Sequence, residues 1–301
     1  MTTSRWTTLR PEWPTVGLII LCTSAWAAGV WAIGHWETWW LLPLLALPVA
    51  LHSSLQHEAI HGHPTRSRAA NEALVFPAVG LFLPYRRFRA LHLRHHRSPD
   101  LTEPLGDPES PYVTPAAWAA MPRWRRALLT VNNTLAGRLV LGPALSLVRL
   151  VADDLAAWRT GRGDIARDWM LHLPALAPVL IWLWFSGVPL WLYALLAAWP
   201  GMAVLSVRTF AEHRRVAERA GRTAVVERGG WLGLIFLNNH LHAAHHRFPF
   251  APWYRLPALC RRMQDHGMIT GDRFRSYGEI FRRYAFRVRE PVADPLARPG
   301  R

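Results

Sequence analysis

The chain has 301 residues, of which 51% are hydrophobic and only 18% are charged, and it contains 17 tryptophans. This composition is typical of a membrane protein and argues against an ordinary soluble domain. All basic residues are arginines, and the formal net charge is +15. A charge of this sign is compatible with binding to anionic lipid, an acidic protein or nucleic acid, and its placement along the chain decides between these partners.

Two pairs of long apolar segments follow one another along the chain. Residues 15–36 and 38–56 are joined by a short turn at Glu37, and residues 169–186 and 188–207 by a turn at Gly187. Each segment has about the ~20 residues that a helix needs to cross the hydrocarbon core of a bilayer. The sequence therefore predicts four transmembrane helices in two hairpins.

The arginines predict the orientation of these spans. Neither hairpin turn carries an arginine, whereas Arg5 and Arg10 precede the first span and many more lie within 86–167 and after 208. By the positive-inside rule, the turns face away from the cytoplasm and residues 57–168 and 208–290 form a cytoplasmic cap. We expect a single all-α domain over residues 1–301 in a bacterial inner membrane, with membrane lipids rather than nucleic acid around it.

Segments between the spans have their own patterns. The apolar runs 73–85 and 231–237 are too short to span a bilayer and are expected to be interfacial or re-entrant segments. Residues 98–115 form a proline-rich loop, whose acidic residues Asp100, Asp107 and Glu109 are expected to pair with arginines. Residues 123–158 are expected to form one basic amphipathic helix on the membrane surface.

Nine of the fifteen histidines fall into four clusters near the cytoplasmic ends of the predicted spans. On a helix, spacings of three and four residues place side chains on one face, where they can bind one ion. Because each cluster follows a span or lies between spans, the clusters are expected to converge at one depth and to bind two metals. They are His57 and His61 in HEAIH, His92, His95 and His96 in HLRHH, His213 in AEHRR, and His242, His245 and His246 in HAAHH.

Imidazole ligands indicate a transition metal, because Mg²⁺ and Ca²⁺ prefer oxygen ligands. A structural zinc site needs only four ligands, so nine histidines favour two metals engaged in redox chemistry. We expect two iron ions that use O2 to attack an unactivated C–H bond. The cysteines Cys22 and Cys260 lie far apart in the sequence and form no metal-binding pair.

The four histidine motifs together, from His57 to about Pro257, resemble the membrane fatty acid desaturase superfamily, which includes alkane hydroxylases and carotenoid ketolases. The resemblance implies transmembrane helices under a cytosolic di-iron cap, with the nine histidines as ligands, and an O2-dependent enzyme that introduces a C=C bond into a fatty acyl or other lipid-like substrate. The stretch NNHLHAAHHRFPFAPWYRLP resembles a bacterial branch near carotenoid ketolases and the desaturase of rhizobitoxine biosynthesis.

Two features qualify this resemblance. Many acyl desaturases have aspartate directly after the first histidine, whereas this chain has Glu58, as the alkane hydroxylases do. A hydroxylase or ketolase on the same scaffold is therefore an alternative. The sequence has no haem-binding domain and no rubredoxin cysteines, so electrons are expected from a separate protein such as a ferredoxin or a cytochrome. Side chains expected beside the metals, with ordinary packing or helix capping as the alternative, are Glu58, His63, Asn238, Asn239 and His240.

Two other classes of protein fit the sequence less well than an oxidase. HEAIH alone also fits a zinc protease, but a protease leaves the other histidine motifs unexplained. A non-catalytic metal transporter or sensor would place ionisable ligands within the spans, whereas these histidines lie at their ends.

Overall fold

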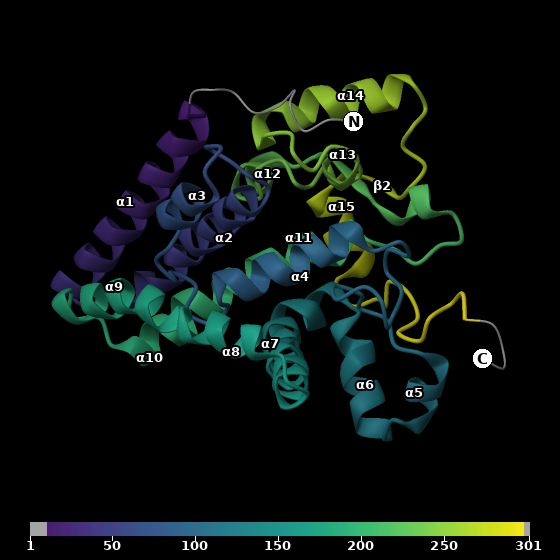
Figure 1. Cartoon of the computed structure of the whole chain (residues 1–301), viewed down its shortest axis with the longest axis horizontal. Helices are drawn as coiled ribbons and strands as arrows, with labels where there is room; N and C mark the ends of the chain where they lie inside the picture. Colours follow the sequence, from purple (N-terminus) through teal and green to yellow (C-terminus); the bar gives the residue numbers. More distant parts are fainter. Residues whose placement is uncertain (1–10, 298–301) are drawn as a thin grey trace. The chain divides into compact units, whose positions relative to one another are not determined.

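The structure is a computed structural model that describes residues 11–297, and the expectation for Arg5 and Arg10 lies outside this range. The described chain is mostly helical, and its only sheet is the parallel pair β1 (Val225–Arg228) and β2 (Arg273–Ser276). The helices of the first half are α1 (Trp13–His35), η2 (Trp39–Leu45), α2 (Ala46–Ile60), α3 (Arg68–Leu74), α4 (Tyr85–Arg97), α5 (Pro115–Ala120), α6 (Arg123–Asn132) and α7 (Leu135–Arg159) (Figure 1). Those of the second half are α8 (Gly163–Met170), α9 (His172–Phe185), α10 (Leu190–Tyr193), the π-helical η3 (Ala194–Ala198), α11 (Trp199–Glu212), η4 (Arg219–Arg222), α12 (Gly230–Ile235), α13 (His242–Arg247), η5 (Trp253–Arg255), α14 (Leu256–Asp265) and α15 (Tyr277–Tyr284).

The described chain divides into two compact units. The first comprises residues up to 89 together with 143–205 and 235–237, and the second comprises 90–142, 206–234 and 238 onward. Three helices, α4, α7 and α11, begin in one unit and end in the other.

Within the described residues, four helical segments are long and apolar enough to cross a membrane: Trp13–His35, Leu135–Arg159, Gly163–Phe185 and Leu190–Glu212. The expected all-α fold with four candidate spans is therefore confirmed. Three of these segments overlap predicted spans, whereas α7 is a candidate in place of residues 38–56. That predicted span is divided between η2 and α2, and Pro43 inside η2 lacks the amide hydrogen of a regular helix.

The expected amphipathic helix 123–158 is two helices. The break lies at Asn133 and Thr134, where the Thr134 hydroxyl accepts a hydrogen bond from the amide of Gly137 at 3.0 Å and caps α7. Gly137 is required there, because a Cβ would meet the Val131 carbonyl oxygen at 1.9 Å. This break separates the arginine-rich α6 from the apolar α7.

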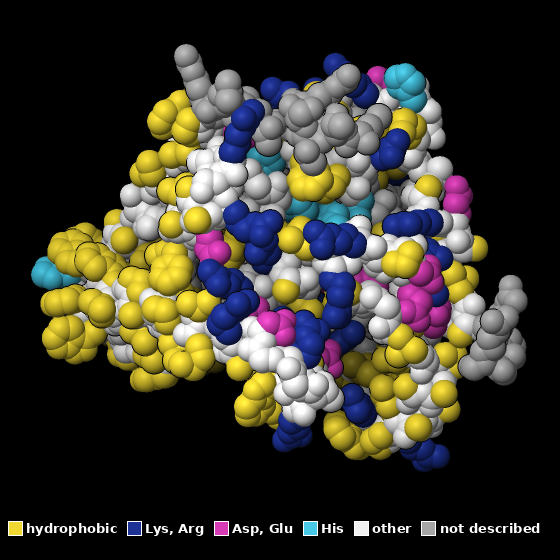
Figure 2. Space-filling model, in the orientation of Figure 1, with side chains coloured by type: hydrophobic (Ala, Val, Ile, Leu, Met, Phe, Trp, Pro, Cys, Tyr) yellow, Lys and Arg dark blue, Asp and Glu magenta, His cyan; other side chains and the backbone are white. Residues whose placement is uncertain are grey.

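The first unit has a core formed by α1, η2, α2, α9 and α10. A buried polar link in this core is Tyr193, whose hydroxyl accepts a hydrogen bond from Trp26 Nε1 and donates one to the Val79 carbonyl, both at 2.8 Å. The two predicted turns lie at Glu37 and Gly187, which both adopt positive φ angles. Figure 2 shows hydrophobic side chains covering the outside of α1, α9 and α10, including exposed tryptophans such as Trp36, Trp184 and Trp191. An apolar outer surface of this kind requires lipid around it.

The second unit contains the β-pair, which joins Val225 to Arg273 and Val226 to Phe274. The strand β1 also contacts a histidine-bearing segment, since the amide of Val226 donates to the carbonyl of His240 at 2.9 Å. Residues near the C-terminus pair with the proline-rich loop through a bridge between Val113 and Ala293. The small sheet and this bridge hold the loops of the second unit in place.

Candidate metal centre

Four histidines from three segments of the second unit meet at one point. His95 lies on α4, His213 follows α11, and His242 and His246 lie on α13. One nitrogen from each ring lies within 4.8 Å of the others, a spacing that could hold a metal ion. Nε2 of His242 is 2.9 Å from Nε2 of His213, and Nε2 of His95 is 3.3 Å from Nε2 of His246. Four Nε2 atoms that face one another form a donor set suited to a transition metal.

Backbone hydrogen bonds from one residue bring two of these segments together. The amide of Ala224 donates to the carbonyl of Glu212 at 2.9 Å, and the Ala224 carbonyl accepts from the amide of Ala243 at 3.2 Å. Ala224 thereby ties the residue before His213 to the residue after His242. These backbone hydrogen bonds thus bring together two candidate ligands that are 29 residues apart.

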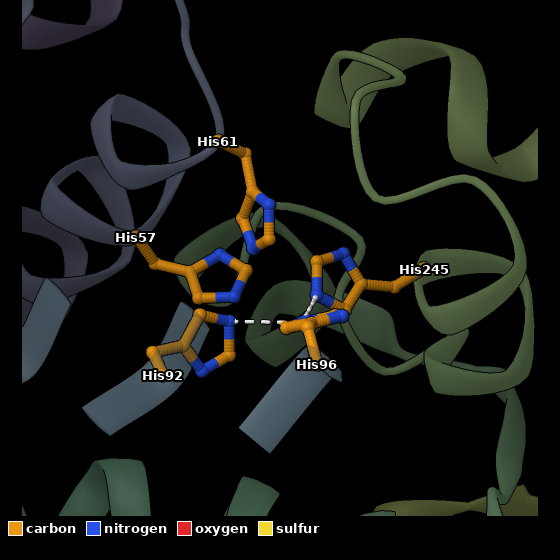
Figure 3. A group of neighbouring side chains, drawn as sticks. All are labelled: His57, His61, His92, His96 and His245. Atoms are coloured by element: carbon orange, nitrogen blue, oxygen red, sulfur yellow. Dashed lines mark hydrogen bonds between the residues drawn. The ribbon is translucent and has the colours of Figure 1, made fainter. Parts of the chain in front are cut away.

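A second set in the same unit consists of His92 and His96 on α4 and His245 on α13. Nε2 of His96 lies 3.0 Å from Nε2 of His92 and 2.9 Å from Nε2 of His245, and dashed lines mark both contacts in Figure 3. The helical spacing of α4 turns His92 and His96 to one side, whereas His95 belongs to the first set. The HLRHH motif therefore supplies both sets.

His57 and His61, also drawn in Figure 3, belong to the first unit. They lie at the end of α2, four residues apart, with ring centroids 4.8 Å from each other. Both side chains are buried, and the ring of His57 lies beside Phe88, 6.4 Å between centroids. Two buried imidazoles at i and i+4 on a helix provide a ready chelating pair.

Carboxylates lie behind the histidines of the second unit. Oδ1 of Asp107 is 2.8 Å from Nδ1 of His95, and Oε1 of Glu109 is 2.8 Å from Nδ1 of His92. Oε1 of Glu212 is 3.2 Å from Nδ1 of His242. The hydrogen bonds of Asp107 and Glu109 favour the tautomer that carries its proton at Nδ1, which leaves the Nε2 lone pair for a metal.

The proline-rich loop holds two of these carboxylates rigidly. Oδ2 of Asp107 accepts the amide of Thr102 at 2.7 Å, and Oδ1 accepts the amide of Glu109 at 2.9 Å. The Ser110 hydroxyl donates to the Thr102 carbonyl at 2.7 Å. The loop is therefore built around the Asp107 side chain.

Asp107 and Glu109 were expected to pair with arginines, and this expectation was wrong, because both carboxylates contact histidines. Asp100 does pair with Arg215 and Arg222, as expected. The sequence signal for the missed role of Glu212 is its place directly before His213 in the same motif.

The five side chains expected beside the metals have different surroundings. Oδ1 of Asn239 lies 3.2 Å from Nδ1 of His242, which places Asn239 against a histidine of the first set. Asn238 donates to the Trp253 carbonyl, and His63 contacts Glu12. The ring of His240 lies against Gly229 and Gly233, where a Cβ would come within 3.0 Å of it. Glu58 is a buried residue of α2 between the two histidines of HEAIH.

Burial keeps most of these imidazoles neutral. Burial, and then the nearby His92, lower the pKa of His96 to about 2. Burial and then His95 lower the pKa of His213 to about 3, and burial holds the pKa of His242 and of His246 well below the usual value. The neutral imidazole is the form that binds metals.

The pKa of His95 is shifted in the opposite direction. Burial lowers its pKa, but Glu109 and Asp107 outweigh burial and raise the pKa of His95 to about 9. In the metal-free protein His95 is therefore protonated at neutral pH, and a metal must displace this proton.

An apolar helical fold with four candidate spans indicates an integral membrane protein, and its grouped histidines could hold metal ions. The family model named Fatty acid desaturase matches residues 34–274, which is more than half of the chain, and the chain belongs to this family. Membership makes the protein an oxidoreductase of lipids in a membrane context. A search of the curated proteins gave no match.

Proposed function

We propose that this protein is an O2-dependent di-iron desaturase that introduces a C=C bond into a fatty acyl or other lipid-like substrate. The main support is the sorting of seven histidines of the second unit into two sets with facing Nε2 atoms. Two sets of imidazoles match two metals better than one.

The proposed ligands divide as follows. His95, His213, His242 and His246 would hold one iron, and His92, His96 and His245 would hold the other. His57 and His61 are proposed as further ligands of the second iron, as the resemblance of HEAIH to the family motif implies. The bound irons would supply the O2 activation needed to remove hydrogen from an unactivated methylene. This chain's own residues would select the imidazole tautomers, because Asp107, Glu109 and Asn239 are hydrogen-bonded to Nδ1 atoms and leave Nε2 for the metals.

The buried surroundings of the histidines support oxidation rather than hydrolysis at this centre. The side chains of His95, His242 and His245 are almost fully buried. Exclusion of water protects a reactive oxidant from side reactions.

The proposal extends to the setting of the enzyme. We infer a bacterial inner membrane with the histidines on the cytoplasmic side, and a separate ferredoxin or cytochrome as electron donor. We also infer a relationship to the branch of carotenoid ketolases and rhizobitoxine-biosynthesis desaturase, from the stretch that ends in HAAHHRFPFAPWYRLP.

Lipid and metabolite profiles of host cells test this function. Cells with the active protein should accumulate a product that has lost two hydrogen atoms, and cells with the His246→Ala variant should not. The matched control is His266→Ala, because His266 is an exposed histidine whose Nδ1 contacts only the carbonyl of Arg262 among described residues. A product with one added oxygen would identify a hydroxylase, and identical profiles for the active protein and His246→Ala would contradict oxidation by this centre.

A further inference from the structure

The first turn of α4 places positively charged side chains at the amino end of the helix. Arg86 and Arg87 lie in this turn, Arg89 follows it directly, and the turn has no acidic residue. The amino end of a helix already bears a partial positive charge, so cations there are unfavourable and anions are favourable. The charge of these arginines therefore needs compensation from elsewhere.

Two of the three arginines have their own carboxylates within the first unit. Arg87 donates to both oxygens of Asp154, at 2.6 and 2.9 Å, and Nε of Arg86 donates to Oε1 of Glu72 at 2.6 Å. Each of these carboxylates is thus engaged by one guanidinium.

Arg89 and its neighbour Arg68 lack such a partner. Among residues 11–297, no carboxylate lies within ion-pair distance of either guanidinium. Burial, and then repulsion from Arg68, lower the pKa of Arg89, so these two cations repel each other. Ser67 caps α3 by accepting the amide of Ala70, which fixes the backbone of Arg68.

A buried hydroxyl in the same place also lacks a partner. Tyr85 is only 9% exposed, and its Oη has no hydrogen-bond partner among the described residues. Burial, and then the charge of Glu72, raise the pKa of Tyr85 to about 12, against the opposing effect of Arg89 and Arg68. The hydroxyl is therefore a neutral donor, and a buried donor without an acceptor is costly.

We propose that Arg68, Tyr85 and Arg89 form a binding site for a phosphate group, carried by a lipid or free in solution. Two guanidiniums and one hydroxyl supply donors from two helices, which suits an anion with three or more acceptor oxygens. The anion would supply the missing counter-charge, accept the Tyr85 hydroxyl and lie at the amino end of α4. This binding does not depend on the oxidation proposed above.

The test compares melting temperatures of the purified protein in neutral detergent with added lysophosphatidic acid or lysophosphatidylcholine of the same acyl chain. Lysophosphatidic acid should raise the melting temperature more, and inorganic phosphate in a further arm distinguishes the source. A rise with inorganic phosphate shows that the free anion suffices, whereas a rise with the phospholipid alone shows that the site takes a lipid head group.

Variants connect the effect to these residues. Arg68→Gln and Arg89→Gln should each lower the apparent affinity for phosphate by about tenfold, so that a higher phosphate concentration is needed for the same rise in melting temperature. Without ligand they should melt at or above the wild-type temperature, because the repulsion is relieved. Tyr85→Phe should weaken the rise less, and Arg125→Gln, an exposed arginine of α6, should not change it.

Three results would overturn the proposal. They are an undiminished rise in Arg89→Gln, no rise in the wild-type protein with either phosphate probe, and a ligand-free melting temperature of Arg89→Gln well below the wild-type value. The last result would assign the guanidinium a structural role. None of these measurements depends on lipid oxidation, so failure here is distinguishable from failure of the proposed function.

Discussion

Oδ1 of Asp107 lies 2.8 Å from Nδ1 of His95, and both side chains are almost fully buried. The same carboxylate accepts the amides of Thr102 and Glu109. Asp107 therefore fixes the loop and the orientation of one proposed ligand at once. It contacts no Nε2 atom of the histidine sets, so its contribution to metal binding is indirect.

The Asp107→Asn substitution tests this positioning role. The amide preserves the shape of the side chain but removes the charge that orients the His95 ring, so the affinity for iron should fall by about 10- to 100-fold. Competition with a chelator under anaerobic conditions measures this affinity. Asp265→Asn, a change of an exposed aspartate on α14, is the matched control and should leave the affinity unchanged. If Asp107→Asn binds iron with the wild-type affinity, Asp107 does not position His95 for metal binding.

Metal affinity should depend on pH because of His95. Its pKa of about 9 in the metal-free protein means that a proton occupies the ring at neutral pH. Binding releases this proton, so the apparent affinity should rise about tenfold per pH unit from about pH 7 and level off above about pH 9. Chelator competition across this range measures the slope. An affinity that stays constant between pH 7 and pH 9 would disagree with a protonated His95.

The metal-free protein should lose stability in acid. The pKa values of His96, His213, His242 and His246 are lowered in the folded state, so the unfolded chain binds more protons once the pH falls below about 6.5. Each such group contributes a loss of about 1.4 kcal/mol per pH unit. Melting temperatures at pH 5 and pH 7 measure the effect, and His213→Gln should reduce the difference. Equal melting temperatures at both values would show that these imidazoles are not buried as neutral groups.

Close packing of α1 gives a prediction about stability. A Cβ on Gly34 would come within 1.8 Å of the backbone carbonyl oxygen of Ser186. Because backbone cannot move aside as a flexible side chain can, Gly34→Ala should lower the melting temperature. Gly17, on the same helix, has open space around it. Gly17→Ala should therefore be neutral or stabilising by up to about 1 kcal/mol. If both variants melt alike, the contact between α1 and the turn after α9 is not close.

Much of this structure follows from periodicity and spacing in the sequence. The hairpin turns at Glu37 and Gly187 follow from span length. The spacing within HLRHH and HAAHH predicted that each motif binds one ion, and this was wrong, because each motif supplies histidines to both sets. The break between α6 and α7 depends on a threonine cap and a contact of Gly137 with the preceding turn, which a hydrophobic pattern does not reveal. Likewise, Asp107 lies in a loop whose fold depends on its own hydrogen bonds, so residue spacing alone gave no indication of its partner.

The number of iron ions bound per chain tests the central claim most directly. Elemental analysis of protein loaded with iron anaerobically should give about two ions per chain, because two sets of imidazoles are available. The His213→Ala/His242→Ala variant and the His57→Ala/His61→Ala variant should each retain about one, since each pair belongs to a different proposed site. A single ion in the wild-type protein, or two ions in both paired variants, would contradict the two-metal centre.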